Sequence, residues 1–234
     1  MNTPSSWSDR RARIEEYFDR TASDAWARLT SDAPVSRIRA TVRAGRNRMR
    51  STLSGWLPAD LAGQRVLDAG CGTGALAVEL AQRGAHVVAV DLSRTLVDLA
   101  RERLPADIGT GHVEFHAGDF LDERLGRFDW VVAMDSLIHY RPQDAAQALA
   151  RLAPRTRRGI AFTFAPRTPM LAAMHAVGQL FPRGNRSPAV EPLPESAVTT
   201  QVARSLLLAG WRLGRRQRIA EGFYISQAQE LLAP

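Results

Sequence analysis

Apolar and polar positions alternate in a regular rhythm along the central part of the chain. Short apolar runs that predict strands cover residues 65–69, 86–90, about 112–117, 128–135 and 159–164. Between them, apolar residues recur at helical spacing over residues 74–83, 93–104 and 145–152. Strands that alternate with helices in this way predict a parallel sheet with helices on both faces.

Two helices are predicted before the first strand. Residues 9–30 carry an apolar stripe that consists of Ile14, Tyr17, Phe18, Ala22, Trp26 and Leu29. Residues 36–57 carry a second buried stripe that consists of Ile38, Val42, Met49, Leu53 and Trp56. Arginines follow one flank of this second helix at positions 39, 43, 46 and 50. This flank is either a solvated basic face or a surface that contacts acidic groups.

The chain departs from the alternation after the fifth predicted strand. Residues 167–195 contain several prolines and predict an insertion that begins with a methionine-rich helix. A helix over 195–209 follows, and residues 211–219 and 222–226 predict a closing antiparallel pair of strands.

Composition narrows the class of protein. The 234 residues, 45% hydrophobic and 24% charged, suit one globular domain. No apolar stretch approaches the ~20 residues that span a bilayer, and the polar start lacks a signal-peptide core. The single cysteine, Cys71, precludes an intrachain disulfide, so a reducing cytoplasm is the expected compartment. The net charge of +7 comes from arginine without any lysine and leaves nucleic acid, polyanionic small molecules and acidic proteins open as partners.

The most informative motif is Val-Leu-Asp-Ala-Gly-Cys-Gly-Thr-Gly at residues 66–74. A glycine-rich turn between a strand and a helix is a nucleotide-binding device. The spacing of Gly70, Gly72 and Gly74 differs from the dinucleotide fingerprint, and no lysine follows as in a P-loop. Asp68 would repel a pyrophosphate and would suit a cationic ligand such as S-adenosylmethionine. The pattern D-x-G-x-G-x-G resembles the first motif of class I S-adenosylmethionine-dependent methyltransferases.

That resemblance implies a fold and a cofactor site. The fold is an α/β, Rossmann-like, seven-stranded, mostly parallel sheet with helices on both faces, N-terminal arm helices in residues 1–60 and a core in 61–234 with a lid insertion at about 167–195. Asp91 would take the ribose hydroxyls, and Asp119 would accept from the adenine amino group. The implied cofactor-binding residues are Tyr17, Asp68, Gly70, Cys71, Gly72, Gly74, Asp91, Leu92, Asp119, Phe120, Met134 and Asp135.

Several further segments resemble the magnesium-protoporphyrin IX O-methyltransferases of chlorophyll and bacteriochlorophyll synthesis, a photosynthetic pathway. They are Tyr-Phe-Asp-Arg-Thr-Ala at 17–22, Asp-Ser-Leu-Ile-His-Tyr at 135–140, Phe-Thr-Phe-Ala-Pro-Arg-Thr at 162–168, Gly-Gln-Leu-Phe-Pro at 178–182 and Gly-Phe-Tyr-Ile-Ser at 222–226. Residues 25–32 look most like the bacteriochlorophyll branch. One position departs from the pattern, because Thr30 stands where plant and cyanobacterial members carry a tyrosine.

The family resemblance implies methyl transfer from S-adenosylmethionine to one propionate of Mg-protoporphyrin IX, giving the monomethyl ester. A propionate is already ionised at neutral pH, so no strong base is required. We interpret His139 as the catalytic residue, a donor that orients the propionate. Candidate substrate-binding residues are Arg39, Arg43, Met170, Met174 and His175. The magnesium belongs to the substrate, and we expect no metal site in the protein.

The resemblance also implies contact with the large subunit of magnesium chelatase and at most peripheral association with photosynthetic membranes. We expect no nucleic-acid partner, because the chain lacks the Asn/Asp-Pro-Pro-aromatic motif of adenine methyltransferases. The alternatives are a methyltransferase that acts on another small molecule, such as a phenol, and a non-catalytic tetrapyrrole carrier.

Overall fold

The computed structural model describes residues 7–19, 23–31, 34–167 and 209–234, together with isolated positions between 191 and 200. Its helices are α1 (Trp7–Tyr17), α2 (Ser23–Leu29), α3 (Arg37–Trp56), α4 (Ala75–Ala81), α5 (Arg94–Glu102) and α6 (Pro142–Leu152), with short 3-10 turns η2 (Glu123–Leu125), η3 (Leu137–His139) and η4 (Ala153–Arg155). Its strands are β1 (Arg65–Ala69), β2 (His86–Asp91), β3 (His112–Ala117), β4 (Phe128–Ala133), β5 (Thr156–Phe164), β6 (Arg212–Glu221) and β7 (Tyr224–Leu232).

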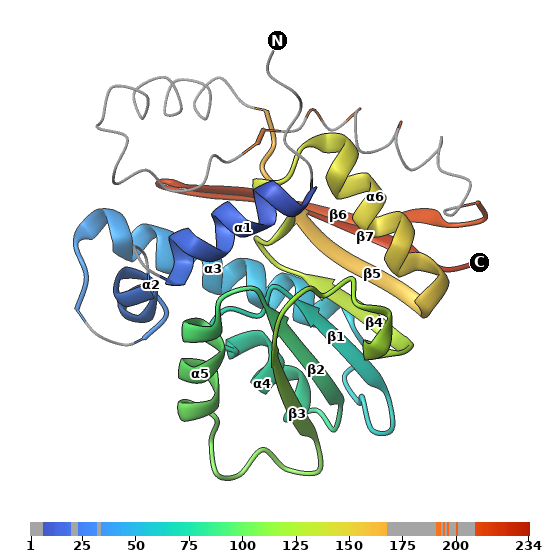
Figure 1. Cartoon of the computed structure of the whole chain (residues 1–234), viewed down its shortest axis with the longest axis horizontal. Coiled ribbons are helices and arrows are strands. Elements are labelled where there is room, and N and C mark those ends of the chain that lie inside the picture. The colour runs from blue at the N-terminus through green and yellow to red at the C-terminus, as the bar shows by residue number, and fades with distance from the viewer. Residues whose placement is uncertain are drawn as a thin grey trace.

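These seven strands form one sheet in the order β3-β2-β1-β4-β5-β7-β6. All neighbouring pairs from β3 to β5 are parallel, whereas β7 runs antiparallel to both β5 and β6. The order reverses between β1 and β4, because β2 and β3 extend to one side and β5 to the other (Figure 1). In open α/β sheets, ligands bind at the carboxyl ends of the strands at such a switch point. The fold predicted from the sequence is confirmed.

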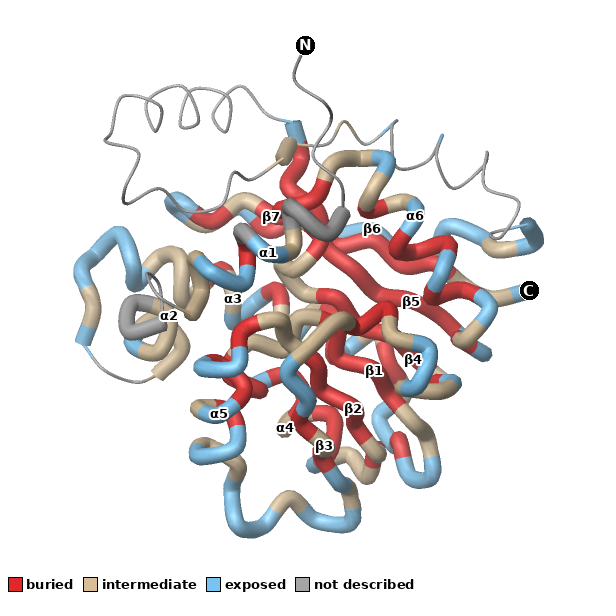
Figure 2. Tube along the Cα trace, in the orientation of Figure 1, coloured by how far each residue is buried: buried red, intermediate tan, exposed pale blue. Residues whose placement is uncertain are grey.

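Helices cover both faces of the sheet, and its central strands are largely buried (Figure 2). Side chains of these central strands alternate between two cores. In β2, Val88 and Val90 face the core that includes residues of α6, whereas Val87 and Ala89 face the core built with α3, α4 and α5. The central strands are therefore buried on both sides, which explains their continuous apolar runs.

Most predicted elements match the observed ones, and β1 and β3 begin and end where they were predicted. The single helix predicted over 9–30 is wrong, because the chain forms α1 and α2, with Asp19 between them bonded to the start of α5. Ile38 does not belong to the buried stripe of α3, since it is 55% exposed. The fourth strand ends at Ala133, two residues early, where the backbone turns to a positive φ at Asp135.

Two predictions fall on residues that the structure does not describe. The lid insertion at about 167–195 lies almost wholly outside the described residues, and so does the helix over 195–209. Within the described ranges, no helix has both the length and the apolar composition needed to cross a bilayer.

Candidate functional site

A cavity of about 700 Å³ opens at the carboxyl ends of β1, β2 and β4, within the size range of small-molecule sites. Its floor is the turn between β1 and α4, and its other walls come from the arm helices α1 and α2, from α3, and from the turn between β6 and β7 with the start of β7. Segments far apart in the sequence therefore enclose one space.

The glycine-rich turn needs glycine for steric reasons. Gly70 has a φ of +85°, and a Cβ there would lie 2.3 Å from the Cβ of Ser136. Gly74 has a φ of +82°, and a Cβ there would lie 3.0 Å from the ring of Phe115. Both positions combine a left-handed backbone with a close neighbour, so only glycine fits without strain. The turn thereby brings its backbone to the edge of the cavity.

Asp68 lies beneath this turn, and its carboxylate is buried without a full set of hydrogen-bond partners in the described part of the chain. Its side chain is buried, and its Oδ2 has no hydrogen-bond partner among the described residues. Burial, followed by the nearby charge of Asp91, raises the pKa of Asp68 to about 7, although a hydrogen bond with the backbone at Ala77 acts in the opposite direction. A buried acid with an unpartnered oxygen at the cavity wall suits a cation supplied by a ligand.

Asp91 and Cys71 complete the polar floor. The backbone N–H groups of Gly72 and Ser93 donate to the Asp91 carboxylate at 2.8 and 3.0 Å. Burial nevertheless raises the pKa of Asp91. Burial, together with the charges of Asp91 and Asp68, raises the pKa of the Cys71 thiol, so this cysteine stays protonated and is no nucleophile at neutral pH.

A second carboxylate at the cavity wall, Asp135, has a side chain that is 5% exposed and accepts hydrogen bonds from three elements, α3, β5 and β7. Arg46 of α3 donates to Oδ2 at 2.6 Å, Tyr224 of β7 donates to both oxygens, and the hydroxyls of Thr163 and Ser226 donate to Oδ1. Burial and the Asp135 charge raise the pKa of Tyr224, which therefore remains a neutral donor.

The backbone at Asp135 is also unusual, with a φ of +54°. A non-glycine residue in this region costs on the order of 1–3 kcal/mol, and such strain clusters at functional sites. The strained turn directs the following segment, which contains η3, along the cavity, where Ser136, Ile138 and His139 are lining residues.

Aromatic side chains of the arm form the roof. The ring of Phe18 meets Tyr17, Trp26 and His139 edge-on at centroid distances of 5.3, 5.6 and 6.0 Å. The guanidinium of Arg46 lies 4.4 Å from the centre of the Trp26 ring. A wall of flat rings is well suited to a large flat ligand.

Hydrogen bonds hold the arm over the cavity. The Asp19 carboxylate accepts from the hydroxyl of Ser93 and from the N–H of Thr95, at the first turn of α5. At the end of α2, Arg43 and Arg103 donate to backbone carbonyls of residues 27–29. Carbonyls in the last turn of a helix have no intrahelical N–H partner, and the arginines supply donors to them.

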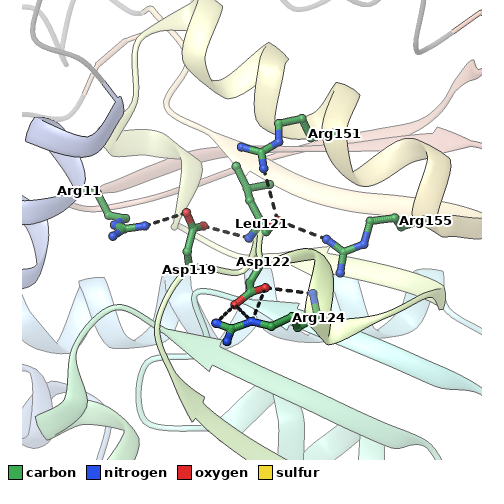
Figure 3. A network of polar contacts seen from close by, with 7 residues as sticks. All are labelled: Arg11, Asp119, Leu121, Asp122, Arg124, Arg151 and Arg155. Carbon is green, nitrogen blue, oxygen red and sulfur yellow. Dashed lines mark hydrogen bonds and ion pairs between the residues drawn. The ribbon is translucent and has the colours of Figure 1, made fainter.

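Figure 3 shows a further contact, between α1 and the segment after β3. Arg11 forms an ion pair with Asp119 at 2.9 Å, and Leu121 N–H donates to the other Asp119 oxygen at 2.9 Å. Arg151 and Arg155 donate to the carbonyl of Leu121 from the other side. In this arrangement the Asp119 carboxylate serves the arm and does not line the cavity.

The structure brings most of the predicted site residues together. Those that line the cavity are Tyr17, Asp68, Gly70, Cys71, Gly72, Asp91, Leu92, Phe120, Met134, Asp135, His139, Arg39 and Arg43. Gly74 and Asp119 do not line it. Met170, Met174 and His175 lie outside the described residues.

Sequence reasoning did not assign Arg46, Trp26 or Tyr224 to the site. The arginine flank of the second helix contained Arg46, but its partner Asp135 is 89 residues away. Their pairing follows from the packing of α3 against β7, which no local sequence pattern predicts.

Comparisons with known proteins agree with this geometry. The family model "Magnesium-protoporphyrin IX methyltransferase C-terminus" matches residues 133–233, and a "Methyltransferase domain" model matches residues 66–159. The chain is 50% identical to the magnesium-protoporphyrin O-methyltransferase of Rhodobacter capsulatus, over 97% of this chain and 98% of that protein.

Relatives from a cyanobacterium are more distant. The chain is 29% identical to the magnesium-protoporphyrin O-methyltransferase of Synechocystis, over 95% of this chain and 96% of that protein. A crystal structure of the Synechocystis magnesium protoporphyrin IX methyltransferase with bound SAH has a TM-score of 0.83 to this fold at 28% identity, covering 96% of this chain and all of that one.

The Asp135 network predicts a difference between two arginines of α3. Arg46 pairs with a carboxylate whose side chain is 5% exposed, whereas Arg48 pairs with Glu221 at the surface. We expect Arg46→Ala to lower the free energy of unfolding by about 3 kcal/mol, because it leaves a buried charge without its cation. Arg48→Ala should cost less than about 1 kcal/mol. Urea denaturation measures both, and equal losses would contradict the network.

Proposed function

The chain belongs to the magnesium-protoporphyrin IX O-methyltransferase family, and from that premise we propose how this cavity performs the family's reaction. The protein transfers a methyl group from S-adenosylmethionine to a propionate carboxylate of Mg-protoporphyrin IX, which yields the monomethyl ester in (bacterio)chlorophyll synthesis. The observation that carries the proposal is the buried, unpartnered Asp68 carboxylate at the wall of a cavity roofed by aromatic rings.

The residues present fit the methyl donor. Asp68 offers its free oxygen to a positively charged group, and the turn at residues 70–74 lets the ligand approach the backbone closely. Asp91 ends β2, where a carboxylate is suited to ribose hydroxyls. When bound, S-adenosylmethionine supplies an electrophilic methyl group on a sulfonium centre. Leu92, Phe120 and Met134 supply apolar surface to the same cavity.

Asp119 is the candidate for the adenine amino group, and it is paired with Arg11 in this arrangement. We propose that Arg11 releases Asp119 when the nucleotide enters, so that the contact between α1 and this segment reports on cofactor binding. Gly74 acts through the shape of the turn, since it does not line the cavity.

The chemistry left to the protein is alignment and exclusion of water. A propionate resembles a glutamate side chain, whose pKa is roughly 4.3, so it needs no base at neutral pH. Attack joins an anion to a cation, and a water-poor cavity favours this loss of separated charge. Positioning alone can contribute roughly 7–11 kcal/mol. The buried turn and the aromatic roof therefore need only align the reactants and exclude water, whereas the methylation of an alcohol also needs a base to remove the hydroxyl proton.

His139 is the proposed orienting residue. It is buried on η3 just beyond β4, lines the cavity and lies against the Phe18 ring. An imidazole N–H in this position would donate to a propionate oxygen and hold it in line with the methyl group. Arg39 at the cavity wall is the candidate partner for the second propionate, whereas Arg43 is engaged with carbonyls of α2 and acts by fixing the arm.

Met170, Met174 and His175 remain proposed contacts to the macrocycle from the insertion. We also propose that the protein receives its poorly soluble substrate from the large subunit of magnesium chelatase, in the cytoplasm or at the membrane periphery. Substrate transfer is supported by the cavity lining, which includes the exposed, apolar Phe223 and the cation Arg39.

One incubation tests the function. Purified protein with methyl-labelled S-adenosylmethionine and Mg-protoporphyrin should place the label on the macrocycle as one methyl ester, identified by mass spectrometry. Metal-free protoporphyrin and a small phenol serve as competing acceptors. Porphyrin binding without ester formation would indicate a carrier, and transfer to the phenol would indicate the alternative enzyme.

Replacement of His139 separates alignment from cofactor binding. We expect His139→Ala to lower turnover by about 100-fold, because a misplaced nucleophile loses the advantage of positioning. The affinity for S-adenosylmethionine, measured by calorimetry, should remain similar. His139→Gln keeps a side-chain N–H donor and should recover part of the rate. Unchanged turnover in His139→Ala would refute the role.

The raised pKa of Asp68 predicts that cofactor affinity depends on pH. Below about 7 the free protein holds a proton on Asp68 that a cationic ligand must displace, so affinity should fall as pH falls from 7.0 to 5.5. The limiting slope is about tenfold per pH unit, and the α-ammonium of the ligand stays protonated in this range.

Asp68→Asn is the matched control for this titration. It should bind more weakly at pH 7 and lose most of the slope, because its side chain carries no titrating proton. The same linkage means that the free protein loses stability as pH rises from about 4 to about 7, because Asp68 ionises in the unfolded chain while the folded protein still holds its proton. A wild-type affinity that is flat from pH 5.5 to 7.0 would contradict the assignment.

A further inference from the structure

Three histidines and one glutamate gather at the edge of the sheet, away from the cavity. His86 begins β2 and stands opposite His112 in the register of β3. Glu114 and His116 follow His112 at steps of two, so all three share one face of β3. None of the four lines the cavity, and the reaction proposed above uses none of them.

The side chains of this cluster converge. His86 Nε2 lies 3.0 Å from Glu114 Oε1, and the rings of His86 and His112 are 5.4 Å apart between centroids. One ligand atom from each of His86, His112 and Glu114 falls within 4.8 Å of the others. A tetrahedral zinc ion at bond lengths near 2.0–2.1 Å holds its ligands ~3.3 Å apart, so rotation of exposed side chains closes the remaining gap.

We propose that His86, His112 and Glu114 form a binding site for a divalent transition-metal ion, with zinc as the ion that the donor set fits best. Two imidazoles and one carboxylate are a recurrent zinc ligand set, and the fourth position remains for water. Magnesium is excluded by the same chemistry, because it prefers oxygen ligands. The site is therefore distinct from the magnesium carried by the substrate.

His116 has a supporting place in this site. Its Nε2 lies 3.5 Å from Glu114 Oε2, the oxygen that does not face His86. Partners of this kind orient a ligating carboxylate from outside the coordination sphere.

The ion would bridge an edge strand to its neighbour. β3 has only β2 beside it in the sheet, and it leads directly into the segment that carries Asp119 and Phe120. A bond from His86 to His112 and Glu114 through one metal ion fixes the start of this strand. No metal site was predicted from the sequence, because His112 and Glu114 lie 26 and 28 residues after His86 and match no linear metal motif.

Calorimetric titration of the full chain, with any histidine tag removed, tests the site. We expect saturable binding of one zinc ion per chain at pH 7.5, a rise in melting temperature with zinc, and no such response to magnesium. His112→Ala and Glu114→Gln should abolish both effects, and His116→Ala should weaken binding by ~10–100-fold. All three positions are at least partly exposed, so the variants should fold as the wild type does.

Glu102→Gln, at an exposed carboxylate on α5, is the matched control and should bind zinc as the wild type does. Absence of saturable zinc binding would overturn the proposal. Binding that survives both His112→Ala and Glu114→Gln would also overturn it, because the ion would then sit elsewhere in the chain. Neither readout requires methyl transfer, so failure of the metal site and failure of the proposed function are distinguishable.

Discussion

The structure depends on one electrostatic constraint, the burial of Asp68 without a cation of its own. Its carboxylate ends in an oxygen with no partner among the described residues, and its pKa rises to about 7 as a result. A protein tolerates such a group when the charge is useful during binding. The glycine turn above it packs so closely against Ser136 and Phe115 that Gly70 and Gly74 admit no side chain. A cationic methyl donor relieves the unfavourable free energy of the buried Asp68 carboxylate, and this relief contributes to the affinity for the donor.

Asp135 differs from Asp68, because groups within the protein satisfy its charge. Its side chain is also largely buried, but α3, β5 and β7 each supply a donor to it, and Arg46 neutralises its charge. This network fixes the strained turn that carries His139 and connects the helix beneath the arm to the sheet. One acid thus prepares the cavity for a ligand, whereas the other sets the shape of the cavity. Because the acceptor is already an anion, the two acids, an imidazole and an aromatic roof suffice without a general base.

The sequence predicted the sheet well because buried parallel strands carry continuous apolar runs that are local signals. The turn at residues 68–74 was likewise readable, since its glycines and its acid are adjacent in the chain. The break between α1 and α2 was not, because it depends on a bond from Asp19 to the distant Ser93. The pairing of Arg46 with Asp135 and the cluster around Glu114 were missed for the same reason: each joins residues from separate elements, and no local pattern encodes which strands or helices become neighbours.

The most direct measurement is the titration of the Asp68 carboxyl carbon by NMR, in the free protein and with S-adenosylhomocysteine bound, whose α-ammonium supplies a positive charge. The account predicts a pKa near 7 in the free protein and a value well below that in the complex, where the ligand's charge favours the carboxylate. A carboxyl that titrates near 4 in the free protein, or whose pKa does not change on binding, would contradict the claim that this acid holds the methyl donor.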